Sequence, residues 1–403
     1  MKSVVLLFHP TSKFGVLGQM IHDLQTAFER KGIRAVIREF QGKDQSAFIE
    51  QVRHDAPDCT WSINTFVDER WFYYPLGIPH VDLSVDSVTY SPPASFSQPS
   101  TVSLFVDKTS CDLFSTFSDR PVHWFPHGIA KEMIDRVRLS PHVPLERRPF
   151  DVTLIGSFLD HKEEKKSWDL LFAPSDVAAF ISMAERTLDD PSFVLLAQAL
   201  SYMQQTPSVR EVLEKRQLPP FFLANSIERY ARGLDRERLL VALKGRSVHI
   251  FTEKEDAIHW SKEEAAHGCR FNPPVPFDEV VDICRMSKVV INSVPHIRKG
   301  YHERLFLSLA SGAVTLVRRG LELPSWLKKT GRVVEYTSSA LEDLVPQLQE
   351  AENRRVDQEK ILAWLETEHS WDARLSQHLP EIEKSVAKLH ADWEENPFWR
   401  MLE

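Results

Sequence analysis

A dense group of charged side chains stands just before an apolar segment near position 300. Arg298 and Lys299 come first, followed by His302 and Glu303 and then by the run "LFLSLASGAVTLV". Arg and Lys favour bound phosphate, whereas a carboxylate accepts hydrogen bonds from sugar hydroxyls. These residue types indicate a site for a phosphorylated, hydroxyl-rich ligand. The ordinary alternative is the solvated start of a helix that carries surface charges.

The pattern around these charges predicts the element that would position them. The runs "SKVVINSV" before them and "AVTLV" after them are short, apolar and rich in β-branched residues, as in buried strands. Between the runs, Leu305 and Leu309 have helical spacing, and Gly312 suits a helix end. This strand–helix–strand order is the crossover of a parallel sheet. The charges would then lie at a helix N-terminus, where N–H groups attract anions.

The composition is that of an ordinary folded protein. The chain has 403 residues, 42% of them hydrophobic and 26% charged, which predicts a globular α/β protein of two domains. Its formal net charge of -8 argues against nucleic-acid binding as the main function. A local basic patch for a phosphorylated or membrane-bound acceptor stays open.

Cysteine use and targeting signals are both inconspicuous. None of the four cysteines forms the close pairs of zinc or redox motifs, so we expect reduced core or surface thiols; they are Cys59, Cys111, Cys269 and Cys284. The apolar run in "MKSVVLLFHPTSK" is too short for a signal peptide. No stretch approaches the roughly 20 apolar residues that span a bilayer. We therefore expect a cytoplasmic protein, with peripheral membrane contact left open.

The order of strand and helix patterns predicts two doubly wound, Rossmann-like domains that face a cleft. The first, 1–147, opens with a strand, a helix and a strand, but its glycines do not make a dinucleotide fingerprint. The second, 148–375, follows a Pro-rich linker and contains a helical insertion at about 168–245. A helical tail, 376–403, ends in "WEENPFWRMLE", whose aromatic residues we expect to dock on a domain surface.

Several segments occur in the order and spacing of a known family. They are "DVTLIGSFLDHKEEKK", "CRFNPPVPFDEVVDICRMSKVVINSV", "HERLFLSLASGAVTLV" and "HSWDARLSQHL". Together they resemble glycosyltransferases of the GT-B fold, specifically the CgeB-like branch. The resemblance covers roughly residues 150–379, and the first half matches in outline through "IPHVDLSVDS" and "WFPHGIAKE".

The resemblance implies a nucleotide-sugar donor in the second domain, with no required metal and no further cofactor. The implied donor-binding residues are Gly156, Ser157, Lys162, Arg270, Phe271, Arg298, Lys299, His302 and Glu303. Gly156 and Ser157 would let the backbone approach the diphosphate, or they form a plain turn; Phe271 would contact the base, or it belongs to the core. Related enzymes usually carry a ribose-binding glutamate where this chain has Leu307, so we expect Glu303 to take that role or to reach the sugar.

The same resemblance implies an acceptor site in the first domain. Asp86 follows the strand "IPHVDLSV" and could act as general base on an acceptor hydroxyl; His127, in "FPHGIAKE", is the second catalytic candidate. His9, which ends the first strand, is a candidate similar to His127, and Asp82 is a weaker candidate than Asp86. The ordinary alternatives are a turn-forming aspartate and a structural histidine.

We therefore expect a metal-independent glycosyltransferase that moves a sugar from a nucleoside-diphosphate donor, UDP-sugars included, to a hydroxyl of a glycan, a lipid-linked sugar or a protein. Two alternatives stay open: a nucleotide-sugar epimerase of the same fold, and a non-catalytic binding or assembly protein. The epimerase would convert the donor without an acceptor. The stereochemical course and the oligomeric state are not predicted.

Overall fold

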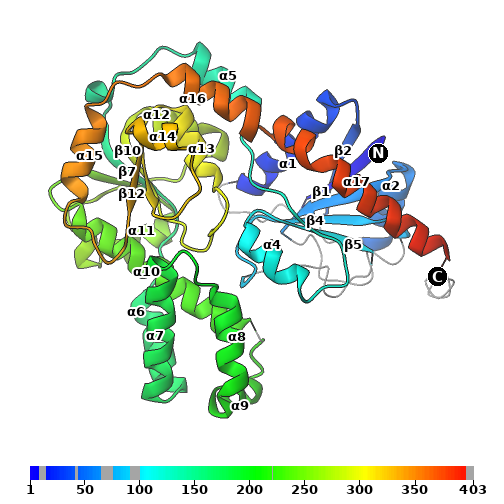
Figure 1. The fold of residues 1–403 in the computed structure, drawn as a ribbon, viewed down its shortest axis with the longest axis horizontal. Helices are drawn as coiled ribbons and strands as arrows, with labels where there is room; N and C mark the ends of the chain where they lie inside the picture. Colours follow the sequence, from blue (N-terminus) through cyan, green and yellow to red (C-terminus); the bar gives the residue numbers. More distant parts are fainter. Residues whose placement is uncertain (9–14, 41–43, 65–75, 91–99, 220, 396–403) are drawn as a thin grey trace. The chain divides into compact units, whose positions relative to one another are not determined.

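The computed structural model describes residues 1–8, 15–40, 44–64, 76–90, 100–219 and 221–395. The chain forms two compact units, and each is built on a parallel sheet with six strands among the described residues (Figure 1). Unit 1 comprises Met1–Asp135, Pro276–Asp278 and Trp364–Glu403, and unit 2 comprises Arg136–Val275 and Glu279–Ala363. This confirms the expected α/β class with two Rossmann-like domains.

The division between the units differs from the expected boundary at 147 and the expected separate tail. Residues 136–148 belong to unit 2, because Arg148 ties this segment to that unit. The last helix, α17 (Trp371–Glu395), belongs to unit 1. Trp371 explains this, since its ring stacks on that of Phe125 with centroids 6.3 Å apart. The expected docking of "WEENPFWRMLE" lies outside the described residues and side chains.

The sheet of unit 1 has the strand order β2-β1-β3-β4-β5-β6, and all its neighbours are parallel. Its strands are β1 (Ser3–Phe8), β2 (Arg34–Glu39), β3 (Cys59–Ile63), β4 (His80–Ser84), β5 (Thr101–Phe105) and β6 (Val122–Trp124). Its other described helices are α1 (Val16–Arg30), α2 (Gln45–His54), α4 (Lys108–Ser115) and α5 (Lys131–Leu139), which runs into unit 2. The apolar side of α1 packs on the sheet, where Phe28 meets Trp61 edge to face at 5.2 Å.

The sheet of unit 2 has the order β12-β11-β10-β7-β8-β9 and is also parallel throughout. Its strands are β7 (Phe150–Ile155), β8 (Val248–Phe251), β9 (Arg270–Asn272), β10 (Ser287–Asn292), β11 (Val314–Arg318) and β12 (Val333–Tyr336). The helices after β8 are α11 (Lys254–Trp260), α12 (Val280–Arg285), α13 (Glu303–Ala310), α14 (Ser325–Lys329), α15 (Leu344–Glu352) and α16 (Gln358–Trp364). Apolar residues of its central strands, such as Val152, Leu154 and Ile291, form the core.

The expected helical insertion lies between β7 and β8. It consists of α6 (His161–Leu171), α7 (Pro174–Asp189), α8 (Leu195–Gln205), α9 (Pro207–Lys215) and α10 (Phe222–Ala242). In Figure 1, α7, α8 and α9 extend away from the strands of unit 2, whereas α10 returns toward them. Across the described ranges, no helix has both the length and the apolar character needed to cross a membrane.

Arg148 fastens the segment before β7 to unit 2. Its Nη1 donates to the carbonyl oxygen of Ser287 at 2.9 Å, its Nη2 to that of Ser311 at 2.8 Å, and its Nε to that of Val143 at 3.1 Å. Burial lowers the pKa of Arg148 to about 10, with the charges of Arg332 and Arg285 adding to the effect. The guanidinium thus satisfies carbonyl groups at the ends of several elements, which is a structural role.

Replacing Arg148 by Met should lower the free energy of unfolding by about 2 to 4 kcal/mol, because several buried carbonyl groups lose their donor. Urea denaturation followed by circular dichroism measures this. Arg147→Met is the matched control, because Arg147 is exposed. Equal stabilities of the two variants would contradict the structural role of Arg148.

Candidate functional site

The crossover predicted around position 300 is present in unit 2. Strand β10, helix α13 and strand β11 follow one another, and β10 and β11 are parallel neighbours. Leu305 and Leu309 are buried, and Gly312 has a φ of 72°, the left-handed conformation expected after the helix end. The start of α13 therefore lies at the carboxyl ends of the strands, where open α/β sheets bind ligands.

Three arginines, which we call the arginine cluster, come together beside this edge. Arg232 and Arg236 lie on α10, four residues apart, and Arg304 lies in the first turn of α13. The side chain of Arg236 donates from Nη1 to the carbonyl oxygen of Ser157. A Cβ atom at Gly156 would lie 3.4 Å from its Nη2. The expected backbone turn after β7 is thus brought together with the cluster.

The cluster is positively charged and poor in water. Burial lowers the pKa of Arg236 to about 9, and the charges of Arg232 and Arg304 lower it further. Burial also lowers the pKa of Arg304, which the carboxylate of Glu303 opposes. Within the described residues, the buried Nε atoms of Arg232 and Arg236 and the buried Nη1 of Arg304 have no hydrogen-bond partner. Such donors are costly to bury, so the geometry favours an anionic ligand.

His302 and Glu303 form the start of α13. The N-terminal cap is His302, whose Nδ1 accepts from the backbone N–H of Arg304 at 3.3 Å and lies 3.0 Å from Oε2 of Glu303. Glu303 is 8% exposed. A buried carboxylate therefore stands beside the arginine cluster, where it can accept hydrogen bonds from hydroxyl groups.

Position 307 lies deeper in the same helix. Leu307 is 1% exposed and packs among the buried residues of α13. Glu303, one turn nearer the edge, is the carboxylate that this helix places at the site.

The other two expected cations near position 300 lie differently. Arg298 is buried, and its Nη1 lies 3.5 Å from the carbonyl oxygen of Asp190, just beyond the end of α7. Lys299 is exposed. The contact of Arg298 joins the loop after β10 to the helical insertion.

The three remaining donor-side candidates lie on or after other elements. Lys162 is 51% exposed, and hydrogen bonds to Glu263 and Glu237 raise its pKa, so two carboxylates balance its charge. Arg270 begins β9 and is exposed. Phe271, next to it, packs against the core of unit 2, which agrees with its ordinary alternative.

Sequence reasoning missed the arginines of α10. The sequence predicts the segment "RYARGLDRERLL" only as part of the helical insertion, with no role in the site. A usable signal was present: arginines four residues apart share a helix face, and Gly233 stands inside the helix, where glycine is unfavourable unless packing requires it. A Cβ atom at Gly233 would lie 2.4 Å from the carbonyl oxygen of Leu159. The glycine lets α10 approach the turn after β7.

The acceptor candidates lie in unit 1. Asp86 is exposed just after β4, and its Oδ2 accepts from Nδ2 of Asn64 at 2.6 Å. The Oδ1 of Asn64 in turn accepts from the backbone N–H groups of Val85 and Asp86 at 2.8 and 3.1 Å. A side chain that follows β3 therefore orients the carboxylate that follows β4.

His127 has a different environment. It is 1% exposed, and burial together with the charge of Arg374 lowers its pKa to about 3. Its carbonyl oxygen accepts from Nε of Arg374 at 3.1 Å. The imidazole is therefore neutral and weakly basic, which suits a structural histidine better than a general base. His9 lies outside the described residues.

Asp82 belongs to a buried polar row on the sheet of unit 1. The two ring nitrogens of His80 lie 2.8 Å from Oγ1 of Thr60 and 2.9 Å from Oγ of Ser62, and Ser62 donates to Oδ1 of Asp82 at 3.2 Å. All four side chains are buried. Asp82 thus lies within the sheet, whereas Asp86 lies at its edge.

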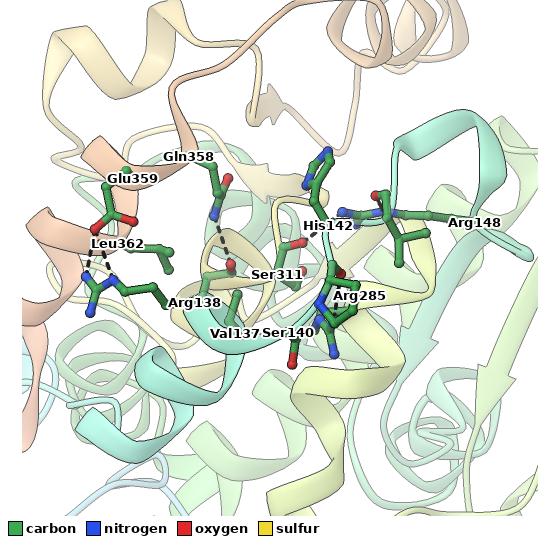
Figure 2. A pocket seen from close by; sticks show the side chains of 13 residues that line it. Val137, Arg138, Ser140, His142, Arg148, Arg285, Ser311, Gln358, Glu359 and Leu362 are labelled. Carbon is green, nitrogen blue, oxygen red and sulfur yellow. Dashed lines mark hydrogen bonds and ion pairs between the residues drawn. The ribbon is translucent and has the colours of Figure 1, made fainter.

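A separate cavity of about 200 Å³ lies within unit 2 beside Arg148. Figure 2 shows that Gln358 reaches a backbone carbonyl and that Arg138 pairs with Glu359 along its wall. The cavity adjoins the C-terminal end of α13, whereas Arg304 of the arginine cluster lies in the first turn of that helix. Its cations are bound to carbonyl or carboxylate oxygens, and we assign no ligand to it.

No group of three or more His, Cys, Asp or Glu side chains within the described ranges is arranged to hold a metal ion. The cysteines are unpaired, and burial raises the pKa of the Cys59 and Cys284 thiols to about 12. They are inert as nucleophiles at neutral pH.

Comparison with known proteins gives the class. Residues 232–379, from α10 into α17, match a family model described as glycosyl transferase-like. No curated protein matches the chain. Among solved structures, a glycosyltransferase from Rickettsia africae ESF-5 is 11% identical, with a TM-score of 0.51 and coverage of 96% of this chain and 99% of that one.

Two further structures have the same architecture. AviGT4, a glycosyltransferase involved in avilamycin A biosynthesis, is 8% identical with a TM-score of 0.52, covering 96% of this chain and 98% of that one. An alpha-glucosyltransferase solved with UDP is 10% identical, with a TM-score of 0.52. The match covers 96% of this chain and 100% of that one. The protein therefore has the GT-B fold of glycosyltransferases, and its segment 232–379 is glycosyl transferase-like in sequence.

Replacing Gly233 by Ala should destabilise the protein by about 1 to 3 kcal/mol, because the added methyl group meets a backbone oxygen that cannot move aside. In an ordinary helix interior the same change stabilises by roughly 0.5 to 1 kcal/mol. Urea denaturation measures whether the replacement lowers or raises the free energy of unfolding. A stabilised variant would contradict the close approach of α10 to the turn after β7.

Proposed function

We propose that this protein transfers a sugar from a nucleoside-diphosphate sugar to a hydroxyl acceptor, and that the arginine cluster binds the diphosphate. The glycosyltransferase fold and the family match support the reaction class. The observation that carries the proposal is the set of buried guanidinium donors beside Gly156 and Ser157, at the ligand-binding edge of unit 2. An anion with several oxygens matches those donors.

Sugar transfer from a nucleoside-diphosphate sugar needs positively charged groups beside the diphosphate. The bond between the anomeric carbon and the diphosphate oxygen breaks, and that oxygen keeps the electron pair. The acceptor oxygen forms the new bond to the anomeric carbon, and its proton passes to a base. Charge therefore grows on the diphosphate in the transition state, and guanidinium groups in a site poor in water stabilise it strongly.

Two carboxylates, one in each unit, receive roles in this proposal. Glu303 accepts hydrogen bonds from ribose or sugar hydroxyls, in place of the glutamate that Leu307 replaces. Asp86, oriented by Asn64, is the general base for the acceptor hydroxyl. The acceptor is a glycan, a lipid-linked sugar or a protein.

Uracil is the first base to test. The alpha-glucosyltransferase that shares the fold was solved with UDP. Nucleoside diphosphates bound through three arginines would need no metal for charge stabilisation, so metal-independent transfer is part of the proposal.

Calorimetric titration without metal, using UDP, GDP, ADP, TDP, CMP and pyrophosphate, tests the site. We expect one nucleoside diphosphate to bind, and Arg236→Met to weaken that binding about 10- to 100-fold, because a buried charged hydrogen bond is lost. Arg238→Met is the matched control on the same helix, since a bidentate ion pair with Glu185 already balances Arg238.

Two results would contradict the proposal. If no member of the panel binds to the wild type, the chain is not a nucleotide-sugar enzyme. If Arg236→Met binds as tightly as Arg238→Met, the cluster is not the diphosphate site. Conversion of a bound donor without any acceptor would instead favour the epimerase alternative.

A further inference from the structure

Asp235 lies between the two arginines of α10 in sequence, and its side chain is bound to the strand ends of unit 2. It is 0% exposed, and its Oδ2 accepts from Oγ of Ser293 at 2.5 Å and from the hydroxyl of Tyr336 at 2.7 Å. Ser293 follows β10, and Tyr336 ends β12. One carboxylate oxygen therefore joins the insertion helix to the ends of two strands that are not neighbours in the sheet.

The strand between them takes part as well. Arg318 ends β11, and its charge attracts that of Asp235. Its Nη1 also donates to the carbonyl oxygens of Thr187 and Leu188 in α7 at 2.8 and 3.4 Å. Asp235 thus links α10 by hydrogen bonds to the ends of β10 and β12, and by charge to Arg318 at the end of β11.

Holding a helix on a sheet through a buried carboxylate costs free energy, because the carboxylate must leave water. Removing the charge from water disfavours it and raises the pKa of Asp235, and apolar side chains of similar size would often give equal stability. Hydrogen bonds differ from apolar packing because they fix direction. Two donors on one oxygen restrict the rotation of α10 about its own axis and its position along the strand ends.

That rotation determines where the arginines lie. Arg232 and Arg236 are three residues before and one residue after Asp235, so any turn of α10 carries both guanidinium groups with it. Gly233 sets the distance of the helix from the turn after β7, since its Cα faces the carbonyl oxygen of Leu159. The contacts of Gly233 and Asp235 are complementary: one sets distance and the other sets orientation.

We propose that Asp235 is a positioning residue of the diphosphate site: its hydrogen bonds to Ser293 and Tyr336 hold α10 in the rotation that aims Arg232 and Arg236 at the ligand. This rests on the proposed function, because it assigns the anion site to the arginine cluster. Asp235 does not touch the ligand. Its effect is to preorganise groups that do.

Tyr336→Phe tests this with little change in shape, because only one hydroxyl is removed. The probe is inorganic pyrophosphate, and both its affinity and the free energy of unfolding are measured. Tyr202→Phe is the matched control: Tyr202 donates to Oδ1 of the buried Asp176 at 2.7 Å, elsewhere in unit 2. We expect similar losses of stability in the two variants, but a loss of pyrophosphate affinity of about tenfold in Tyr336→Phe alone.

Rescue by a conservative replacement gives a second measurement. Asp235→Asn keeps the shape and one acceptor oxygen, whereas Asp235→Ala keeps neither. We expect Asp235→Asn to bind pyrophosphate more tightly than Asp235→Ala and more weakly than the wild type. Asp176→Asn, the control carboxylate on α7, should bind it as the wild type does.

The outcomes separate this inference from the proposed function. If the wild type binds neither pyrophosphate nor a nucleotide, the proposed function fails and the inference fails with it. If the wild type binds pyrophosphate and Tyr336→Phe and Asp235→Asn bind it equally well, the anion site stands and Asp235 has no positioning role. Equal losses of affinity in Tyr202→Phe and Tyr336→Phe would also overturn it.

Discussion

The burial of positive charge at the edge of the unit 2 sheet is the constraint on which the rest of this site depends. Arg232, Arg236 and Arg304 repel one another, and burial withdraws Arg236 and Arg304 from water. Such a group is tolerated only where the surrounding structure holds it firmly and where an anion can bind. The turn at Ser157 and the carboxylates nearby supply part of the compensation, and a bound diphosphate would supply the remainder.

Other arginines and lysines of unit 2 differ from the arginine cluster because carboxylates balance their charges. Arg246 is held by Asp151 and Glu352 at 2.7 and 2.6 Å, and Arg238 and Lys162 are likewise paired with carboxylates. Those charges are already neutralised and serve the packing of the unit. Arg232, 3.7 Å from Glu228, Arg236 and Arg304 each keep one buried donor atom without a partner among the described residues, and these three lie together at the edge where open parallel sheets bind ligands.

Much of this arrangement could be predicted from local pattern. Short apolar runs and helical spacing predicted the crossover from β10 to β11, with Glu303 and His302 at the start of its helix and Gly312 at its end. The turn at Gly156 and Ser157 was also predicted. The role of α10 was not, because Arg236 is far from Ser157 in sequence and resembles any charged residue of an amphipathic helix.

The sequence by itself determined the elements, the parallel sheets and the resemblance to glycosyltransferases, because these follow from periodicities and motifs within short segments. Only the tertiary structure decided which charges are neutralised and which are available. Lys162 was a phosphate candidate in sequence and Arg236 was not, yet Lys162 is paired with Glu237 and Glu263, while Arg236 is buried beside Ser157. The physical reason is that the state of a charge depends on distance and burial, and both arise from contacts between residues remote in the chain.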